Sequence, residues 1–283
     1  MKLLNSVPFA SKFALLLACT VFGFVNILPL ILVVNSSART NNLIKENETE
    51  ASSKIVFIPR TRREEEGEPY NQSSDGTYGE DRCPQSVPSL TALVPGKGLE
   101  ESETEPAATE KTYWSITAQE FPTLWFYVPY PTSGELEAKL KVMTNETREV
   151  VYNNIYQLNG TPGIIGLTIK DEALVVGKDY HWSFTIICDP ENRDSDVYVQ
   201  GKIARVAATP KFTPLPTAKP EEKVDLYARD GLWNETLTTI FTELYPSNPK
   251  QAKEYLRGLL GSEYVNLESL AEQPVVPCCD SSY

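Results

Sequence analysis

The chain has 283 residues, of which 41% are hydrophobic and 23% charged, a composition that can build a globular core and excludes a wholly disordered chain or a collagen-like fibre. Its formal net charge of −12 disfavours a basic nucleic-acid interface, so we expect no nucleic-acid partner. The single histidine, His181, excludes a zinc site built from three histidines.

The first 38 residues have the pattern of an export signal. Lys2 and Lys12 precede an uncharged apolar run over residues 13–34, and small residues up to Ala38 follow it, as at a signal-peptidase site. The run is also long enough to cross a bilayer, so a retained N-terminal anchor is the alternative interpretation. Either interpretation predicts a periplasmic or extracellular protein, with membrane contact only through residues 13–34 if the segment is not cleaved.

Residues 39–82 are polar and poor in hydrophobic side chains. Such a segment cannot bury enough apolar surface to offset the entropy lost on ordering, which predicts a disordered linker. The short apolar run at residues 55–58 is the exception and has the composition of an isolated strand.

Between residues 83 and 208 the hydrophobic pattern has a period near two, which indicates β-strands. Turn signals such as Asn159-Gly160 separate the apolar runs. Strands are expected at residues 123–128, 136–142, 150–158, 165–169, 180–188 and 197–203. Strands and helices do not alternate, so the pattern predicts a mainly β fold, an Ig-like antiparallel β-sandwich.

The period changes after a Pro-rich linker at residues 209–220. Apolar residues then recur at helical spacing over residues 221–276, and Asn248 followed by Pro249 is a typical helix start. We expect a C-terminal α-helical hairpin followed by a tail at residues 277–283.

Four of the five cysteines follow the expected signal. Cys278 and Cys279 are adjacent, and a bridge between neighbours is strained. An oxidising compartment therefore favours a disulfide between Cys83 and Cys188. Two buried free thiols are the alternative. For the terminal pair, a crosslink to another chain and a pair of unbonded thiols are both open.

Hard oxygen ligands crowd the turn after Cys188. The candidate Ca²⁺ ligands are Asp189, Asn192, Asp194 and Asp196. The alternative is a polar hairpin loop in which the aspartates cap the backbone and Arg193 neutralises their charge. Calcium is the only cofactor that the sequence suggests.

Two further features fit either a site or a structural role. His181 would have to serve any Ser-His-Asp triad, and its alternative is a half-exposed residue on a strand. The tryptophans fit a sugar-stacking surface or a core: Trp114, Trp125, Trp182 and Trp233.

Several short motifs follow one another in a fixed order. They include Cys-Pro at residues 83–84, an aromatic run between prolines at 122–130, and the segments 90–95, 162–165, 180–184, 188–190 and 227–233. The ordered set resembles the cyanobacterial family called domain of unknown function 928, over about residues 83–275. The resemblance implies an exported bacterial protein and carries over no catalytic residue.

Export, acidity and the absence of a catalytic motif favour a non-enzymatic protein-interaction module of the cell envelope. Its expected partner is an envelope or secretion-associated protein, and the sequence does not fix an oligomeric state. A glycan- or Ca²⁺-binding domain is the second hypothesis. A hydrolase that uses carboxylates alone is the third, because acidic residues are abundant.

Overall fold

The structure, a computed structural model, describes residues 55–59, 72–73, 83–84, 86–97, 112–131, 136–209 and 217–281. The chain divides into two units, residues 1–52 and 53–283, and every described residue belongs to the second. The expected export signal at residues 1–38 lies outside the described residues. Within the described ranges, no helix is both long enough and apolar enough to span a membrane.

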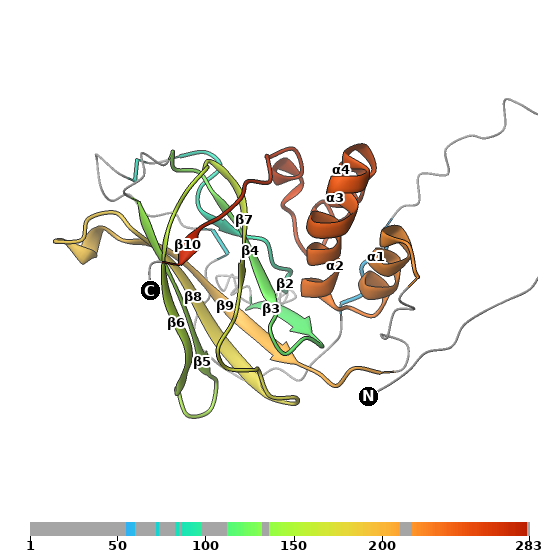
Figure 1. The fold of residues 1–283 in the computed structure, drawn as a ribbon, viewed down its shortest axis with the longest axis horizontal. Helices are drawn as coiled ribbons and strands as arrows, with labels where there is room; N and C mark the ends of the chain where they lie inside the picture. The colour runs from blue at the N-terminus through green and yellow to red at the C-terminus, as the bar shows by residue number, and fades with distance from the viewer. Residues whose placement is uncertain are drawn as a thin grey trace, which may run out of the picture. The chain divides into compact units, whose positions relative to one another are not determined.

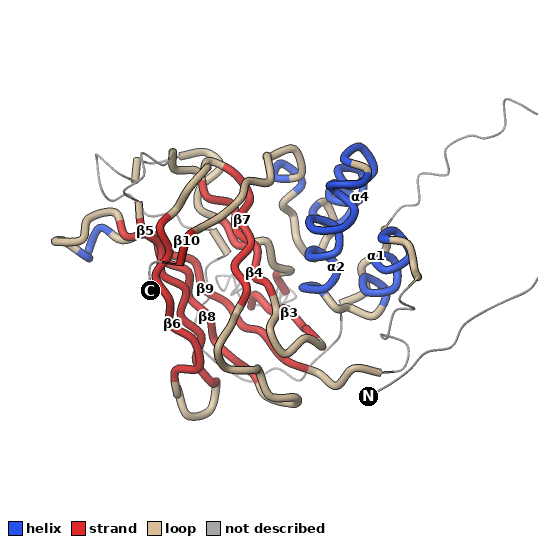
Figure 2. The backbone as a smooth tube through the Cα atoms, in the orientation of Figure 1, coloured by secondary structure: helices blue, strands red, loops and turns tan. Residues whose placement is uncertain are grey.

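Two β-sheets form most of the described structure, which confirms the mainly β prediction (Figures 1 and 2). The large sheet has the strand order β10-β6-β5-β8-β9-β3-β2, and the small sheet has the order β1-β4-β7. In chain order the strands are β1 (Thr91–Ala92), β2 (Gly96–Lys97), β3 (Thr112–Thr117), β4 (Thr123–Val128), β5 (Glu137–Thr144), β6 (Val150–Gln157), β7 (Gly163–Thr168), β8 (Asp179–Ile187), β9 (Val197–Arg205) and β10 (Asp280–Ser281).

The alternating pattern of β5 shows how the sequence builds the core between the sheets. Ala138, Leu140 and Val142 are fully buried, while the residues between them are half-buried. Successive side chains of a strand point to opposite faces, so a period of two sends every second residue inward. Phe184 of β8 stacks on Phe126 of β4, with ring centroids 4.2 Å apart. The two sheets therefore pack against each other around one shared core.

The expectation of wholly antiparallel pairing is wrong at one position. Strand β3 runs parallel to β9, with Trp114 opposite Lys202 and Thr117 opposite Arg205. The other pairs between the named strands of the described residues are antiparallel. Side-chain alternation marks where a strand runs and which face it buries, but it carries no information about the direction of the neighbouring strand.

The expected two-helix hairpin contains more helices than predicted. The region consists of α1 (Pro220–Arg229), α2 (Trp233–Thr239), the π-helical turn η3 (Ile240–Leu244), α3 (Tyr245–Ser247), α4 (Pro249–Leu260) and the 3₁₀ turn η4 (Glu268–Leu270). Helix α1 ends early because Gly231 adopts a φ of +67°, which glycine reaches without strain. The helix start predicted at Asn248 is confirmed, since its side chain accepts a hydrogen bond from the Gln251 amide.

The helices cover the face of the small sheet that points away from the large sheet (Figure 1). Strand β4 supplies both cores, because Phe126 points toward the large sheet and its neighbours Trp125 and Tyr127 point toward the helices. The Trp125 ring lies 4.4 Å from that of Phe241 in η3. Its Nε1 donates a hydrogen bond of 3.1 Å to Thr238 Oγ1.

Residues 55–59, inside the predicted linker, pack on this helical layer. Ile55 and Phe57 are buried, whereas Val56 and Ile58 are exposed. The backbone amide of Ile58 donates to the carbonyl of Ala228 in α1 over 3.1 Å. The apolar run that stands out from its polar surroundings is therefore an ordered segment of the fold.

Residues 274–281, which include most of the predicted tail, run along the edges of both sheets, and we call them the C-terminal strap. The Val276 amide donates to the Ile164 carbonyl over 3.0 Å at the edge of β7. Farther on, Asp280 and Ser281 pair with Gln157 and Tyr156 at the edge of β6. The strap thus occupies backbone groups that a free sheet edge would expose. This coverage of the two sheet edges accounts for the position of the strap.

Candidate functional site

A cavity of about 210 Å³ lies where the turn between β3 and β4 meets the helices. Turn residues form one wall and residues of α1, α2 and η3 form the other: Gln119, Phe121, Pro122, Thr123, Tyr227, Asn234, Glu235, Thr238, Thr239 and Glu243. Most of these side chains are polar, in contrast to the two hydrophobic cores. A polar cavity at the junction of two structural layers is the candidate site that we develop below.

Glu235 connects the two walls of the cavity. It lies in the first turn of α2 and is only 5% exposed. Its Oε1 atom accepts hydrogen bonds from Thr117 Oγ1 at 2.9 Å, from the Ala118 amide at 2.6 Å and from the Gln119 amide at 3.1 Å. One carboxylate oxygen therefore satisfies three donors at the end of β3 and ties that strand to the helices.

The second carboxylate oxygen of Glu235 and the side-chain oxygen of its neighbour Asn234 have no donor. Both Glu235 Oε2 and Asn234 Oδ1 are buried without a hydrogen-bond partner. The Asn234 amide nitrogen is satisfied, since it donates to the Thr123 carbonyl over 3.0 Å. Most buried polar atoms in proteins are hydrogen-bonded, and an unpaired one costs about 1–3 kcal/mol. Two adjacent residues on the cavity wall thus each hold an unused acceptor.

The charges around the cavity are mainly negative. Burial raises the pKa of Glu235 above its ordinary value, against the opposing effect of hydrogen bonds from Ala118, Thr117, its own backbone and Gln119. Burial, followed by the negative charges of Glu235 and Glu243, also raises the pKa of Tyr227. Lys223 of α1 lies nearby, but its Nζ is bound to Glu243 Oε2 at 2.6 Å. The site therefore favours a hydrogen-bond donor that carries positive charge.

Two carboxylates, Glu235 and Glu243, line the same cavity, which is the minimum that the carboxylate-hydrolase hypothesis requires. Each already has a structural partner. Glu235 holds the end of β3 through Oε1, and Glu243 is paired with Lys223. Hydrolysis stays a prediction that these contacts do not favour.

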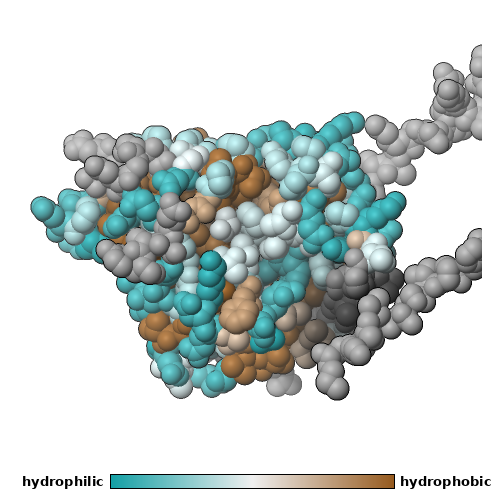
Figure 3. Space-filling view, viewed as in Figure 1, coloured by the Kyte–Doolittle hydropathy of each residue, from teal (hydrophilic) through white to brown (hydrophobic). Residues whose placement is uncertain are grey.

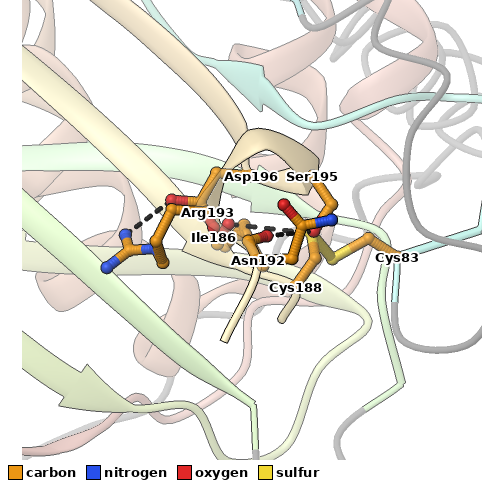
Figure 4. The surroundings of a disulfide bond; sticks show 7 residues. All are labelled: Cys83, Ile186, Cys188, Asn192, Arg193, Ser195 and Asp196. Carbon is orange, nitrogen blue, oxygen red and sulfur yellow. Dashed lines mark hydrogen bonds and ion pairs between the residues drawn. A yellow bond between two sulfur atoms is a disulfide. The ribbon is translucent and has the colours of Figure 1, made fainter. Parts of the chain in front are cut away.

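A second candidate region surrounds the predicted disulfide (Figure 4). Cys83 and Cys188 form a bond with an S–S distance of 2.01 Å, and both residues are buried in the core between the sheets. Cys188 directly follows the last residue of β8 in the large sheet, and Cys83 precedes β1 of the small sheet. The bond fixes the start of the β region to the end of a central strand.

The expected calcium ligands follow Cys188 directly. Arg193 lies in the 3₁₀ turn η1 (Arg193–Ser195), and its guanidinium donates to Asp196 Oδ2, with Nε at 2.8 Å (Figure 4). Asp189 Oδ1 accepts from the Glu191 amide at 2.9 Å. In the part of the chain that the structure describes, no three His, Cys, Asp or Glu side chains are grouped to hold a metal ion. Calcium binding by Asp189, Asn192, Asp194 and Asp196 stays a prediction, and the observed contacts match the polar-loop alternative.

A family model described as Domain of Unknown Function (DUF928) matches residues 72–275. The chain belongs to the DUF928 family. The matched range includes both cysteines of the buried disulfide and every residue that lines the cavity. No curated protein and no solved structure matches the chain.

The structure of this DUF928 protein corrects the expected environment of His181. The sequence predicts a half-exposed residue, whereas His181 is buried and its Nε2 is hydrogen-bonded to Asn145 Oδ1. His181 lies opposite Met143 of β5 and Lys202 of β9, and these neighbours together with Asn145 cover its ring.

The tryptophans of the DUF928 protein are mostly core residues. Trp125, Trp182 and Trp233 are buried, which matches the structural alternative rather than a sugar-stacking surface. Trp114 is half-buried, and the Lys202 ammonium lies 4.7 Å from the centre of its ring. The Trp233 indole donates to the Leu93 carbonyl over 2.7 Å.

Cys278 and Cys279 of the DUF928 protein lie in the C-terminal strap with their sulfur atoms in contact. Both side chains are half-buried against the core between the sheets. The two side chains lie next to each other, and a crosslink to another chain and a pair of unbonded thiols both stay predictions.

Sequence analysis missed the cavity and Glu235. Glu235 bonds to Thr117, which is 118 positions away in the chain, so no local spacing links the two. The one available signal is an acidic residue within an apolar helical stripe, between Trp233 and Leu237. If the buried face of this helix were known, Glu235 would be expected to have a partner elsewhere in the fold, because an ionisable side chain is rarely buried without one.

Proposed function

We propose that this DUF928 protein is an exported, non-enzymatic protein-interaction module of a bacterial cell envelope. Its proposed location is periplasmic or extracellular, its proposed source is a cyanobacterium, and its proposed partner is an envelope or secretion-associated protein. We also propose that the two sheets form an Ig-like β-sandwich, supported by the core that they share.

Export is supported by the disulfide between Cys83 and Cys188. Disulfides persist in oxidising compartments and are rare where cytosolic reductants act. The charged and apolar pattern of residues 1–38 is the second support, because it has the order of an export signal.

A protein-interaction role is supported by three exposed apolar residues on adjoining loops, and this observation carries the proposal. Phe121, Val175 and Val176 are 41%, 49% and 48% exposed, and we call them the loop-end patch. Figure 3 shows apolar surface at the lower edge of the view, where the loop between β7 and β8 lies. Apolar residues gathered on one surface are typical of a contact site, whereas single ones are common everywhere.

The loops that carry this patch are fixed to each other. The Leu174 amide donates to the Glu120 carbonyl over 2.9 Å, and the Ile169 amide donates to the Pro122 carbonyl over 3.0 Å. Leu174 itself is fully buried. A surface held in this way loses little conformational entropy on binding, which favours recognition of a partner.

The proposal is tested by crosslinking in the cells that produce the protein. A C-terminally tagged chain is compared with a patch variant carrying Phe121→Ser, Val175→Ser and Val176→Ser. The matched control carries Val150→Ser and Tyr198→Ser, two residues that are 46% and 45% exposed on strands of the large sheet. We expect one dominant protein in near-equal amount with the wild type and the control, and its loss from the patch variant.

Two results contradict the proposal. The first is that no protein co-purifies in near-equal amount with the wild-type chain. The second is that the same protein co-purifies undiminished with the patch variant.

A further inference from the structure

We propose that the cavity beside Glu235 receives a basic side chain of the protein partner, an arginine or a lysine, whose N–H groups donate to Glu235 Oε2 and Asn234 Oδ1. This inference rests on the proposed interaction function, because it names the chemistry of one contact in that interface. It adds a binding site that neither the family match nor the sequence motifs assign.

The first argument is the pair of unused acceptors. Glu235 and Asn234 are 5% and 3% exposed, both line the cavity, and each has an oxygen without a donor. A buried acceptor that has lost its water and gained no donor destabilises the folded state. An incoming N–H group would remove that cost at both residues. A guanidinium suits the arrangement best, since it presents several donors in a rigid planar group.

The second argument is charge. Glu235 and Glu243 lie on the cavity wall, and Lys223, the nearby cation, is already bound to Glu243. The whole chain carries a net charge of −12, which attracts a basic partner before contact is made. A neutral donor could satisfy the two acceptors without the charge attraction, and an acidic side chain would be repelled.

The third argument is the position of the cavity beside the loop-end patch. Phe121 belongs to both, since it is 41% exposed and also lines the cavity. Strong contacts in protein interfaces commonly place one deeply inserted side chain, often arginine, within a rim that excludes water. Phe121 would form part of such a rim beside the inserted group, and Val175 and Val176 would extend the contact on the adjoining loop.

The protonation state of Glu235 gives an independent consequence. Burial raises the pKa of the Glu235 carboxyl in the free protein. A cation in the cavity favours the ionised form, so binding should release a proton and become tighter as the pH rises. The titratable groups beside Glu235 are Tyr227 of α1 and Glu243 of η3, and from β3 it faces Thr117 and two backbone amides, which do not titrate.

The experiment titrates the purified full chain with Nα-acetyl-arginine methylamide and follows intrinsic tryptophan fluorescence. The neutral control ligand is Nα-acetyl-citrulline methylamide, which has the shape of the arginine compound without its charge. We expect saturable binding of the arginine compound and at least about tenfold weaker binding of the citrulline compound, as for other desolvated charge pairs.

The variant Glu235→Gln removes the charge and keeps an oxygen for the donors of β3. It should weaken arginine binding by at least about tenfold. The matched control Glu254→Gln lies on the exposed side of α4 and should leave binding unchanged. Equal binding of the two compounds, or unchanged binding in Glu235→Gln, overturns the inference.

Should Glu235→Gln fail to fold, measurements on the wild-type chain decide the matter. Calorimetry in two buffers of different ionisation enthalpy measures proton release directly. Release of a proton on arginine binding supports the inference, and equal binding of the arginine and citrulline compounds by the wild-type chain overturns it.

The crosslinking experiment separates this inference from the proposed function. If the partner is lost from the loop-end patch variant but retained by Glu235→Gln, the interaction function stands and the inference about the cavity is wrong. If the wild-type chain captures no partner in near-equal amount, the proposed function fails, whatever the result with the arginine compound.

Discussion

The rings of Phe57 and Trp233 meet edge to face, with centroids 5.0 Å apart and planes at 78°. Phe57 precedes the β region, and Trp233 begins α2, so the contact joins a segment of the predicted linker to the helical layer. Trp233 in turn bonds to the Leu93 carbonyl beside the small sheet. Three distant parts of the chain thus meet at one indole.

Replacement of Phe57 by alanine tests this contact. We expect Phe57→Ala to lower the free energy of unfolding by about 3 kcal/mol, because it removes buried ring surface and leaves a cavity. The neighbouring Val56→Ala is the control, and at 54% exposure it should change the free energy by no more than about 0.5 kcal/mol. Urea unfolding followed by tryptophan fluorescence measures both. Equal stability of the two variants would show that residues 55–59 do not belong to the folded unit.

The buried Glu235 should make stability depend on pH. Because its pKa is raised above the ordinary 4.5, its protonated form stabilises the fold below about that pH, and this contribution is lost as the pH rises through the folded-state pKa. As the pH increases, the free energy of unfolding of the wild type should therefore fall relative to that of Glu235→Gln, which does not titrate at this position. Denaturant titrations from pH 4 to pH 8 measure the difference. A difference that does not change with pH would contradict the prediction.

Removal of the whole Glu235 side chain should have a different effect. Glu235→Ala leaves the donors of Thr117, Ala118 and Gln119 without their shared acceptor. Relative to Glu235→Gln we expect a further loss of about 2–3 kcal/mol at every pH, because unpaired buried donors are costly and neither variant titrates at this position. Glu235→Gln is the matched control, since its side-chain oxygen can still accept these bonds. A loss that is equal in the two variants would rule out the shared acceptor as the cause.

The disulfide between Cys83 and Cys188 should contribute strongly to stability. It joins residues 105 positions apart, and in the chain-entropy model a loop of that size corresponds to at most about 4.7 kcal/mol. Cys83→Ser with Cys188→Ser should lower the melting temperature markedly and make it insensitive to reductant. Cys278→Ser with Cys279→Ser is the control, and its melting temperature should still fall when reductant is added. If the melting temperature of the variant with Cys83→Ser and Cys188→Ser still falls when reductant is added, the stabilisation does not come from the disulfide between these two residues.

The contact between β7 and the C-terminal strap leaves no room for a side chain at Gly163. A Cβ atom there would lie 2.8 Å from both the Pro274 carbonyl oxygen and Val276 Cγ1. Gly163→Ala should therefore displace the strap and speed hydrogen exchange at the Ile164 and Val276 amides, which bond across this contact. Gly177→Ala provides a comparison, since no atom lies within 4 Å of its added Cβ, although its φ of +83° adds local strain. Unchanged exchange at both amides in Gly163→Ala would contradict the role of the strap.

Local patterns predict the strands and their buried faces well. The alternation of Ala138, Leu140 and Val142 is confirmed, because burial of every second residue follows from strand geometry alone. The pairing of Cys83 with Cys188 is also confirmed. The candidate cavity could not be found in this way, since its walls come from a turn before β4 and from helices more than a hundred positions later.

Local sequence was sufficient to predict where the chain forms strands and helices, which faces are apolar and how α4 begins, because these properties depend on neighbouring residues. Three features became visible in the folded chain alone: β3 lies parallel to β9, the strap covers two sheet edges, and one oxygen of Glu235 accepts from Thr117, Ala118 and Gln119. These features join residues far apart in the chain. Their pairing is set by the packing of whole layers, which no short stretch of sequence contains.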